Sequence, residues 1–185
     1  MVPVKGTPGA KSRLGADRAL ADAIALDTVT AAVAAGVRVI VVTPSASRVF
    51  DGLDVTLVDD PGSGLAAAVR AGLDGAGSGP TAALLGDLPA LLPADLAAAL
   101  HAASAFPRAL VPDAEGEGTT LITALRPSDH APAFGPDSRA RHLAAGYVEL
   151  DVPCDSGLRR DVDTAADLAA LASRVGSATA AALAG

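Results

Sequence analysis

Cysteine and aromatic residues are scarce in this chain of 185 residues, which has one Cys and no Trp. A lone Cys154 cannot form an internal disulfide or a cysteine-based zinc site, so we interpret it as a structural or incidental thiol. Long apolar runs are also lacking, because Arg, Asp or Gly interrupts each one well short of the roughly 20 residues that span a membrane. With no leader-like segment at its start, the chain is expected to be cytoplasmic, without a membrane partner.

Positive charge is in deficit too, since 14 Lys and Arg face 21 Asp and Glu and the formal net charge is -7. Nucleic-acid surfaces need broad fields of Lys and Arg, so no nucleic-acid partner is expected. A small phosphorylated ligand needs much less, namely a local pocket of backbone N–H groups, one or two cations and a metal ion. The composition therefore leaves small phosphorylated molecules as the ligands to look for.

Short apolar runs alternate along the chain with longer Ala-rich stretches of helical character, which is the pattern of repeated β-α-β units. Strands are expected at residues 2–4, 37–43, 55–58, 82–85, 110–111, 119–125 and 147–152, and helices at 18–35, 64–72, 93–103, 137–145 and 164–175. This order predicts a single-domain α/β fold with a mostly parallel, Rossmann-like sheet flanked by helices. We expect one domain over residues 1–175 and a flexible or weakly helical tail at 176–185.

The loop after the first expected strand contains the only two lysines of the chain, Lys5 and Lys11, together with Gly6. Arg supplies every other fixed positive side-chain charge, so two compact ammonium groups in one Gly-containing loop indicate a triphosphate cradle. The loop matches neither the P-loop nor the dinucleotide-binding spacing. A solvated surface turn is the alternative interpretation.

Carboxylates follow two other segments in positions suited to a metal. Asp87 lies two residues after an expected strand, and ligands of such sheets bind beyond the carboxyl ends of the strands. Asp161 and Asp163 alternate before the last expected helix, so in an extended segment they point to the same side. One or both would complete a Mg²⁺ site with Asp87, because Mg²⁺ prefers oxygen ligands. Turn or helix-capping carboxylates are the alternative.

Two Gly-containing loops would suit a small phosphorylated acid. Thr119 ends the first loop, and Gly135 and Ser138 lie in the second. Glycine lets backbone N–H groups approach an anion, and hydroxyls add neutral donors, although surface turns have the same composition. Gly64 belongs to a further loop, either a helix entry or part of a base and ribose pocket. No His lies in a metal or triad spacing, and His142 is either a packing or surface residue or one that orients the Ser138 loop.

Taken in order from residue 2 to about 171, these motifs resemble one family. They read Val-Lys…Ala-Lys-Ser-Arg-Leu, Gly-Asp-Leu-Pro-Ala-Leu, Gly-x-Gly-Thr, Phe-Gly-Pro-Asp-Ser-x-Ala-Arg-His and Arg-x-Asp-Val-Asp-Thr. The chain is similar to the phosphoenolpyruvate / 2-phospho-L-lactate guanylyltransferases of deazaflavin coenzyme F-420 biosynthesis. The resemblance implies the fold of the molybdenum-cofactor-guanylyltransferase-like nucleotidyltransferases.

The resemblance also implies partners and roles. GTP and a phosphorylated three-carbon acid would be the substrates, with Mg²⁺ as cofactor on Asp87 and Asp161. Thr119, Gly135 and Ser138 would bind the acid. The GTP phosphates would be faced by Lys5, Lys11 and Arg13.

Two other functions stay open on the sequence. One is a nucleotidyltransferase for a pterin or sugar-like acceptor, although such pockets usually offer aromatic or apolar faces and this chain is poor in aromatic residues. The other is a catalytically inactive nucleotide-binding module that regulates a partner. The choice among phosphoenolpyruvate, 2-phospho-L-lactate and 3-phosphoglycerate is open as well.

Overall fold

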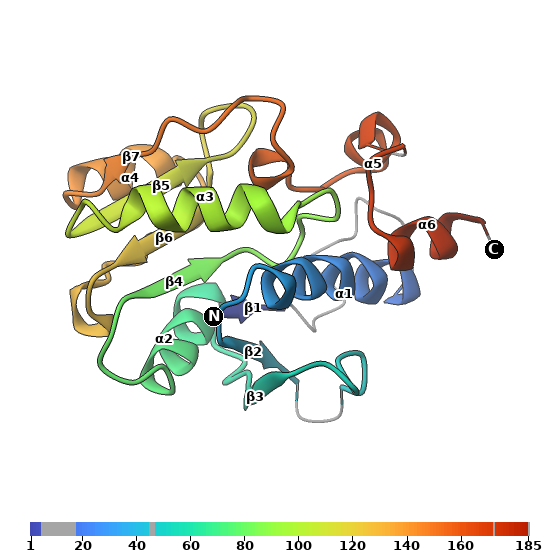
Figure 1. Cartoon of the computed structure of the whole chain (residues 1–185), viewed down its shortest axis with the longest axis horizontal. Coiled ribbons are helices and arrows are strands. Elements are labelled where there is room, and N and C mark those ends of the chain that lie inside the picture. The colour runs from blue at the N-terminus through green and yellow to red at the C-terminus, as the bar shows by residue number, and fades with distance from the viewer. Residues whose placement is uncertain (5–17, 45–46, 172, 185) are drawn as a thin grey trace.

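The computed structural model describes residues 1–4, 18–44, 47–171 and 173–184, with strands at the centre and helices around them (Figure 1). The strands are β1 (Val2–Pro3), β2 (Val39–Thr43), β3 (Val55–Asp59), β4 (Thr81–Leu84), β5 (Arg108–Pro112), β6 (Thr119–Ala124) and β7 (Val148–Glu149). They pair in two groups, with the spatial orders β1-β2-β3 and β4-β6-β5-β7. Parallel pairing joins β1 to β2, β2 to β3 and β5 to β7, whereas β6 runs antiparallel to β4 and β5.

The two groups of strands continue into each other between β1 and β4. The Leu84 N–H donates to the Met1 carbonyl oxygen at 3.0 Å, and the Met1 nitrogen donates to the Ala82 carbonyl oxygen at 2.6 Å. Two bonds from one residue to positions that flank its opposite residue are the pattern of parallel strands. The mostly parallel α/β sheet predicted from the sequence is confirmed, with β6 as the one reversed strand of the described residues.

Helices cover both faces of this sheet. Their bounds are α1 (Arg18–Ala34), α2 (Leu65–Asp74), α3 (Pro93–Ala103), α4 (Ser138–Ala144), α5 (Ala165–Leu171) and α6 (Ser177–Ala184), with 3-10 turns η1 (Pro127–Asp129) and η2 (Gly157–Arg159). Pro93 lies in the first turn of α3, where its missing N–H is tolerated. No helix in the described part of the chain combines the length and the apolar character that a membrane span requires.

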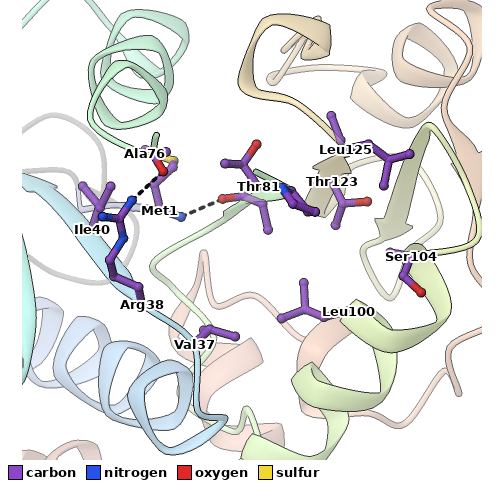
Figure 2. Close-up of a pocket in the computed structure, with 14 residues that line it drawn as sticks. Met1, Val37, Arg38, Ile40, Ala76, Thr81, Leu100, Ser104, Thr123 and Leu125 are labelled. Atoms are coloured by element: carbon purple, nitrogen blue, oxygen red, sulfur yellow. Dashed lines mark hydrogen bonds between the residues drawn. The ribbon is translucent and has the colours of Figure 1, made fainter. Parts of the chain in front are cut away.

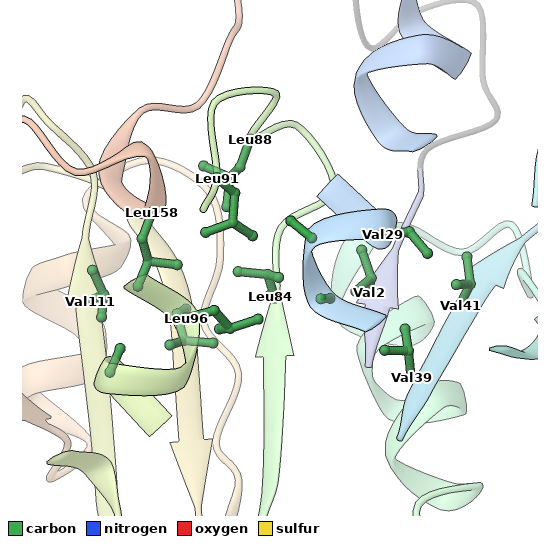
Figure 3. Close-up of a cluster of buried hydrophobic side chains, with 14 of the residues drawn as sticks. Val2, Val29, Val39, Val41, Leu84, Leu88, Leu91, Leu96, Val111 and Leu158 are labelled. Atoms are coloured by element: carbon green, nitrogen blue, oxygen red, sulfur yellow. The ribbon is translucent and has the colours of Figure 1, made fainter. Parts of the chain in front are cut away.

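Two hydrophobic clusters separate the layers. Leu84 of β4 and Val111 of β5 belong to the cluster under α1 and α3, part of which Figure 3 shows. Their neighbours Ala83 and Leu110 belong to the cluster that α2 closes on the other face. Because successive side chains of a strand point to opposite faces, a strand that is apolar at every position must be covered on both sides. This explains the continuous apolar runs that predicted the strands.

Several element ends depend on side-chain hydrogen bonds. Thr164 Oγ1 accepts from the Asp167 N–H at 3.2 Å, and Asp167 Oδ2 accepts from the Thr164 N–H at 2.7 Å. This reciprocal cap begins α5. The first N–H groups of α6 are satisfied by Asp27 of α1, which accepts from Ala178 at 3.0 Å and from Thr179 at 2.8 Å. The domain boundary at residue 175 stays a prediction.

Some expected elements are longer than those observed. The strand expected at 147–152 is reduced to β7, which among the described strands pairs with β5 alone. Its ladder ends with the Leu150 N–H donating to the Leu110 carbonyl. An edge strand has one partner, so it ends where that partner's hydrogen bonds end. The helix expected at 164–175 ends at Leu171.

A close approach of two backbones fixes the segment that leads into the last acidic motif. Gly157 of η2 lies against the Ala90 carbonyl group, and a Cβ atom at position 157 would collide with that oxygen. The Thr120 hydroxyl donates to the Leu158 carbonyl oxygen at 2.7 Å and holds the same turn on β6. Glycine is therefore required at 157 by space.

Gly157→Ala is predicted to lower the free energy of unfolding by roughly 1–3 kcal/mol or more, because the backbone at Ala90 must move. Gly79→Ala is the matched control, since a Cβ atom at position 79 would have no other atom within 4 Å. The control should change stability by no more than about 0.5 kcal/mol. Urea unfolding of both variants measures the difference, and equal midpoints would contradict the prediction.

Candidate active site

The carboxyl ends of β1 and β4 meet at Gly86. A Cβ atom at position 86 would lie 2.9 Å from the Pro3 carbonyl oxygen, so glycine is what allows the two strand ends to come together. The next residue, Asp87, is partly buried and begins a turn that α1 supports. Thr28 of α1 donates its hydroxyl to the Ile24 carbonyl and accepts the Leu88 N–H, both at 3.0 Å. The backbone around Asp87 is thus fixed on both sides.

The second acidic motif is attached directly to the first. The Val162 N–H donates to the Asp87 carbonyl oxygen at 3.0 Å. The Val162 side chain is fully buried with Ile24 and Leu168, whereas Asp161 on one side of it is partly buried and Asp163 on the other side is exposed. The structure therefore places the Asp161–Asp163 segment beside Asp87.

Negative charge accumulates around Asp161. Burial above all, and then the charges of Asp87, Asp163 and Asp113, raise the pKa of Asp161 to about 7. A buried carboxyl with a raised pKa and several acidic neighbours indicates a site where a cation would be favourable. The donor atoms are all carboxylate oxygens, the ligands that hard divalent cations prefer. The residues present therefore fit a divalent metal ion.

Two acidic residues at this place were missed in the sequence. Carboxylate oxygens of Asp113, Glu115 and Asp161 lie within 4.8 Å of one another. Both carboxylate oxygens of Asp113 accept backbone N–H groups, from Glu117 at 3.0 Å and from Gly118 at 2.6 Å. This shaping of the loop gives Asp113 a structural task beside its charge. Its position directly after β5 was the available signal, the same one that singled out Asp87.

The two Gly-containing loops predicted to bind an acid also come together. Arg139 of α4 donates its backbone N–H to the Glu117 carbonyl at 3.1 Å and its side chain to the Gly116 carbonyl at 3.2 Å. Ser138, the first residue of α4, is buried and its N–H donates to the Gly135 carbonyl at 3.1 Å. The start of α4 is therefore fixed against the loop that leads into β6.

Thr119 begins β6 beside these loops and is buried. Its hydroxyl oxygen lies 3.0 Å from Nδ1 of His142, which is fully buried on α4. The sequence suggested for His142 either packing or orientation of the Ser138 loop, and neither interpretation foresaw this contact with Thr119. A contact between residues 23 positions apart leaves no local pattern in the sequence.

The predicted nucleotide site is placed only in part. Lys5, Gly6, Lys11 and Arg13 lie outside the described residues, and their roles stay predictions. Gly64 is exposed, has φ of 90° and precedes the first residue of α2, so its backbone forms the entry to that helix. A small cavity of about 30 Å³ lies nearby, lined by Val4, Leu65, Gly86, Asp87 and four other residues.

A larger cavity of about 410 Å³ lies at the opposite end of the sheet, between Met1, Arg38, Thr81 and Leu100 (Figure 2). The described residues that line it include no carboxylate. The Arg38 guanidinium donates to the Ala76 carbonyl and is thereby engaged with the backbone. None of the predicted site residues contributes to this cavity, so size alone does not locate the chemistry.

Comparisons with known proteins agree with this geometry. Residues 9–160 match the MobA-like NTP transferase domain. A phosphoenolpyruvate guanylyltransferase of Streptomyces avermitilis is 50% identical over 203 residues, covering 100% of this chain and 93% of the relative. A nucleotidyl transferase from Methanothermobacter has a similar structure, with a TM-score of 0.67 at 22% identity, covering 92% of this chain and 93% of the other. A Mycobacterium tuberculosis structure described as a complex with manganese has a TM-score of 0.59 at 24% identity, covering 92% and 94%.

The family match and the relatives' names show that the chain is a nucleotidyltransferase enzyme, and its α/β fold agrees with that class. The chain belongs to the MobA-like NTP transferase family, and within it to the phosphoenolpyruvate guanylyltransferases. The resemblance drawn from the motifs is thereby confirmed, and guanylyl transfer is the function that the relatives' names support.

Asp161→Asn is predicted to stabilise the metal-free protein at pH 8 by about 1–3 kcal/mol. A carboxyl whose pKa is raised on folding holds its proton more tightly in the native state, so native stability falls as pH rises from about 4 towards 7. The Asn variant escapes this loss, and its advantage should grow over the same pH range. Thermal unfolding in chelator measures the difference.

Excess Mg²⁺ should raise the Tm of the wild type more than that of Asp161→Asn. The ion offsets the negative charge of the Asp161 carboxylate, which the variant does not have. Asp54→Asn, an exposed site, is the control and should behave as the wild type. A variant less stable than the wild type at pH 8 in chelator would contradict the charge argument.

Proposed function

We propose that this enzyme joins GTP to phosphoenolpyruvate with release of pyrophosphate, as a step of coenzyme F-420 biosynthesis. The main support is similarity over nearly the whole chain to relatives named phosphoenolpyruvate guanylyltransferase, such as one of Streptomyces coelicolor at 48% identity. Since GTP and phosphorylated three-carbon acids are metabolites of the cytoplasm, we place the reaction there. 2-Phospho-L-lactate is the alternative acceptor within the family.

The proposed cofactor is Mg²⁺, held by Asp87, Asp161 and Asp163. The backbone bond between Val162 and Asp87 and the raised pKa of Asp161 support this assignment. When bound, the ion supplies positive charge beside the reacting phosphates. Asp113 lies in the same acidic group and also shapes the loop, because both its carboxylate oxygens accept backbone N–H groups.

The proposed acid pocket consists of Thr119, Gly135 and Ser138. Their contribution is position: hydroxyl and backbone N–H donors hold the acid so that a phosphate oxygen faces the α-phosphorus of GTP. The fixed contact between the start of α4 and the loop at Glu117 supports such a pocket, because it determines where those donors stand.

The reaction requires no general base. A phosphate oxygen of the acid, already ionised at neutral pH, forms a bond to the α-phosphorus, and the bond from that phosphorus to the bridging oxygen of the β-phosphate breaks in line. The electron pair leaves with pyrophosphate and no proton is transferred. Lys5 and Lys11 are proposed to offset the charge that develops on the pyrophosphate, with Gly6, Arg13 and Gly64 completing the nucleotide site.

Pyrophosphate release with GTP and Mg²⁺ should therefore depend on a phosphorylated three-carbon acid. Phosphoenolpyruvate, 2-phospho-L-lactate and 3-phosphoglycerate are offered in parallel, and phosphoenolpyruvate is expected to give the highest kcat/KM. ATP in place of GTP is the control for the base. Release with another of the three acids would correct the acceptor, and silence with all three would overturn the proposal.

Asp87→Asn is predicted to fold normally and to reduce turnover by about 100- to 1,000-fold, the loss of several kcal/mol of transition-state stabilisation. Its thermal unfolding should stay close to that of the wild type. Asp74→Asn, at the exposed end of α2, is the matched control and should keep full activity. Near-normal turnover of the Asp87 variant would remove Asp87 from the proposed metal site.

A further inference from the structure

The ring of His142 makes two hydrogen bonds, one through each nitrogen. Its Nε2 lies 2.8 Å from the backbone nitrogen of Ala133, and its Nδ1 lies 3.0 Å from the hydroxyl oxygen of Thr119. The ring is completely shielded from solvent. Three segments therefore meet at this side chain: α4, the chain before Gly135 and the first residue of β6.

The partner of Nε2 determines where the ring carries its proton. A backbone N–H can only donate, so Nε2 accepts from Ala133 and must be unprotonated. In a neutral imidazole the proton is then on Nδ1, which donates to the Thr119 oxygen. The imidazolium form would set an N–H against the Ala133 N–H and lose this bond.

The surroundings of the ring support the neutral form. Burial first, then Arg141 and then His130 lower the pKa of His142 to about 4. The rings of Phe134 and Tyr147 pack edge-on against the His142 ring. Their centres lie 5.1 Å and 5.3 Å, respectively, from the centre of the His142 ring. Within the described part of the chain, no carboxylate is among the groups that shift this pKa.

This arrangement leaves one proton free. Because Thr119 Oγ1 accepts from His142, the hydroxyl hydrogen of Thr119 points elsewhere, and none of the described residues accepts it. We propose that His142 is a positioning residue, which holds the Thr119 hydroxyl with its proton directed at an anionic oxygen of the acceptor substrate. This role rests on the proposed function, in which Thr119 binds the phosphorylated acid.

The direction of the hydrogen bonds also strengthens the donor. The Ala133 N–H donates to the ring, the ring donates to the Thr119 oxygen, and the Thr119 hydroxyl donates to the substrate. Successive bonds that run in one direction polarise each other, and a bond to an anion is among the stronger kinds. His142 thereby occupies one acceptor site of the Thr119 oxygen and leaves the hydroxyl proton available for an anionic oxygen of the ligand.

Two substitutions separate this role from simple packing. In His142→Asn the amide lies where Nδ1 was and still donates to Thr119. In His142→Gln the amide reaches the place of Nε2, so it keeps the bond to Ala133 and loses the donor to Thr119. We expect KM for phosphoenolpyruvate to rise about tenfold or more in the Gln variant and less than about threefold in the Asn variant. KM for GTP should stay unchanged in both.

If His142 acted through packing alone, the Asn variant would have the higher KM for phosphoenolpyruvate. Gln fills more of the buried space and keeps the hydrogen bond to Ala133. Thermal unfolding of both variants is therefore measured beside the kinetics. Thr119→Val, which has no hydroxyl, should raise KM for the acid about tenfold by itself. In that background the Asn and Gln variants should have equal KM values for the acid.

Each outcome decides something different. Wild-type protein that releases no pyrophosphate with any of the three acids would overturn the proposed function, and this role of Thr119 with it. An active wild type with equal KM values in the Asn and Gln variants would overturn the positioning role alone. Nitrogen NMR of the His142 ring gives a readout besides activity, and a proton found on Nε2 would overturn the inference.

Discussion

The backbone hydrogen bond from Val162 to Asp87 sets two acidic segments, which are distant in sequence, side by side against their mutual repulsion. Burial, and then the neighbouring carboxylates, raise the pKa of Asp161, so its ionisation near neutral pH lowers the stability of the folded protein. Burial of the Val162 side chain and the close contact between Gly157 and Ala90 offset the repulsion. Without these contacts the carboxylates would separate, and no cation would meet both at once.

The reversed direction of β6 is the second condition for the site. In a parallel sheet the functional edge receives only the carboxyl ends of strands. Because β6 is antiparallel, its first residue, Thr119, lies at that same edge, opposite Pro112 of β5. The acid-binding residues proposed on β6 and α4 and the acidic residues after β4 and β5 thus share one edge of the sheet, although they come from strands of opposite direction.

Local patterns predicted much of this structure. The apolar run before Asp87, the proline that begins α3 and the pairing of Thr164 with Asp167 are short-range signals, and each corresponds to an observed element. The direction of β6 and the contact of Thr119 with His142 depend on partners far along the chain, so periodicity does not reveal them. Asp113 and Glu115, the acidic residues after β5, could have been predicted, because their position after an apolar run is a local signal. We did not use that signal.

The scarcity of aromatic residues has an optical consequence. The chain has one Tyr and no Trp, and Tyr147 packs against His142 while its hydroxyl accepts the Ala131 N–H at 2.8 Å. Near-ultraviolet absorption and intrinsic emission therefore come chiefly from a single chromophore beside the proposed acid pocket. Tyr147 is therefore an intrinsic spectroscopic probe of this region, and changes in its surroundings can be followed without an added label.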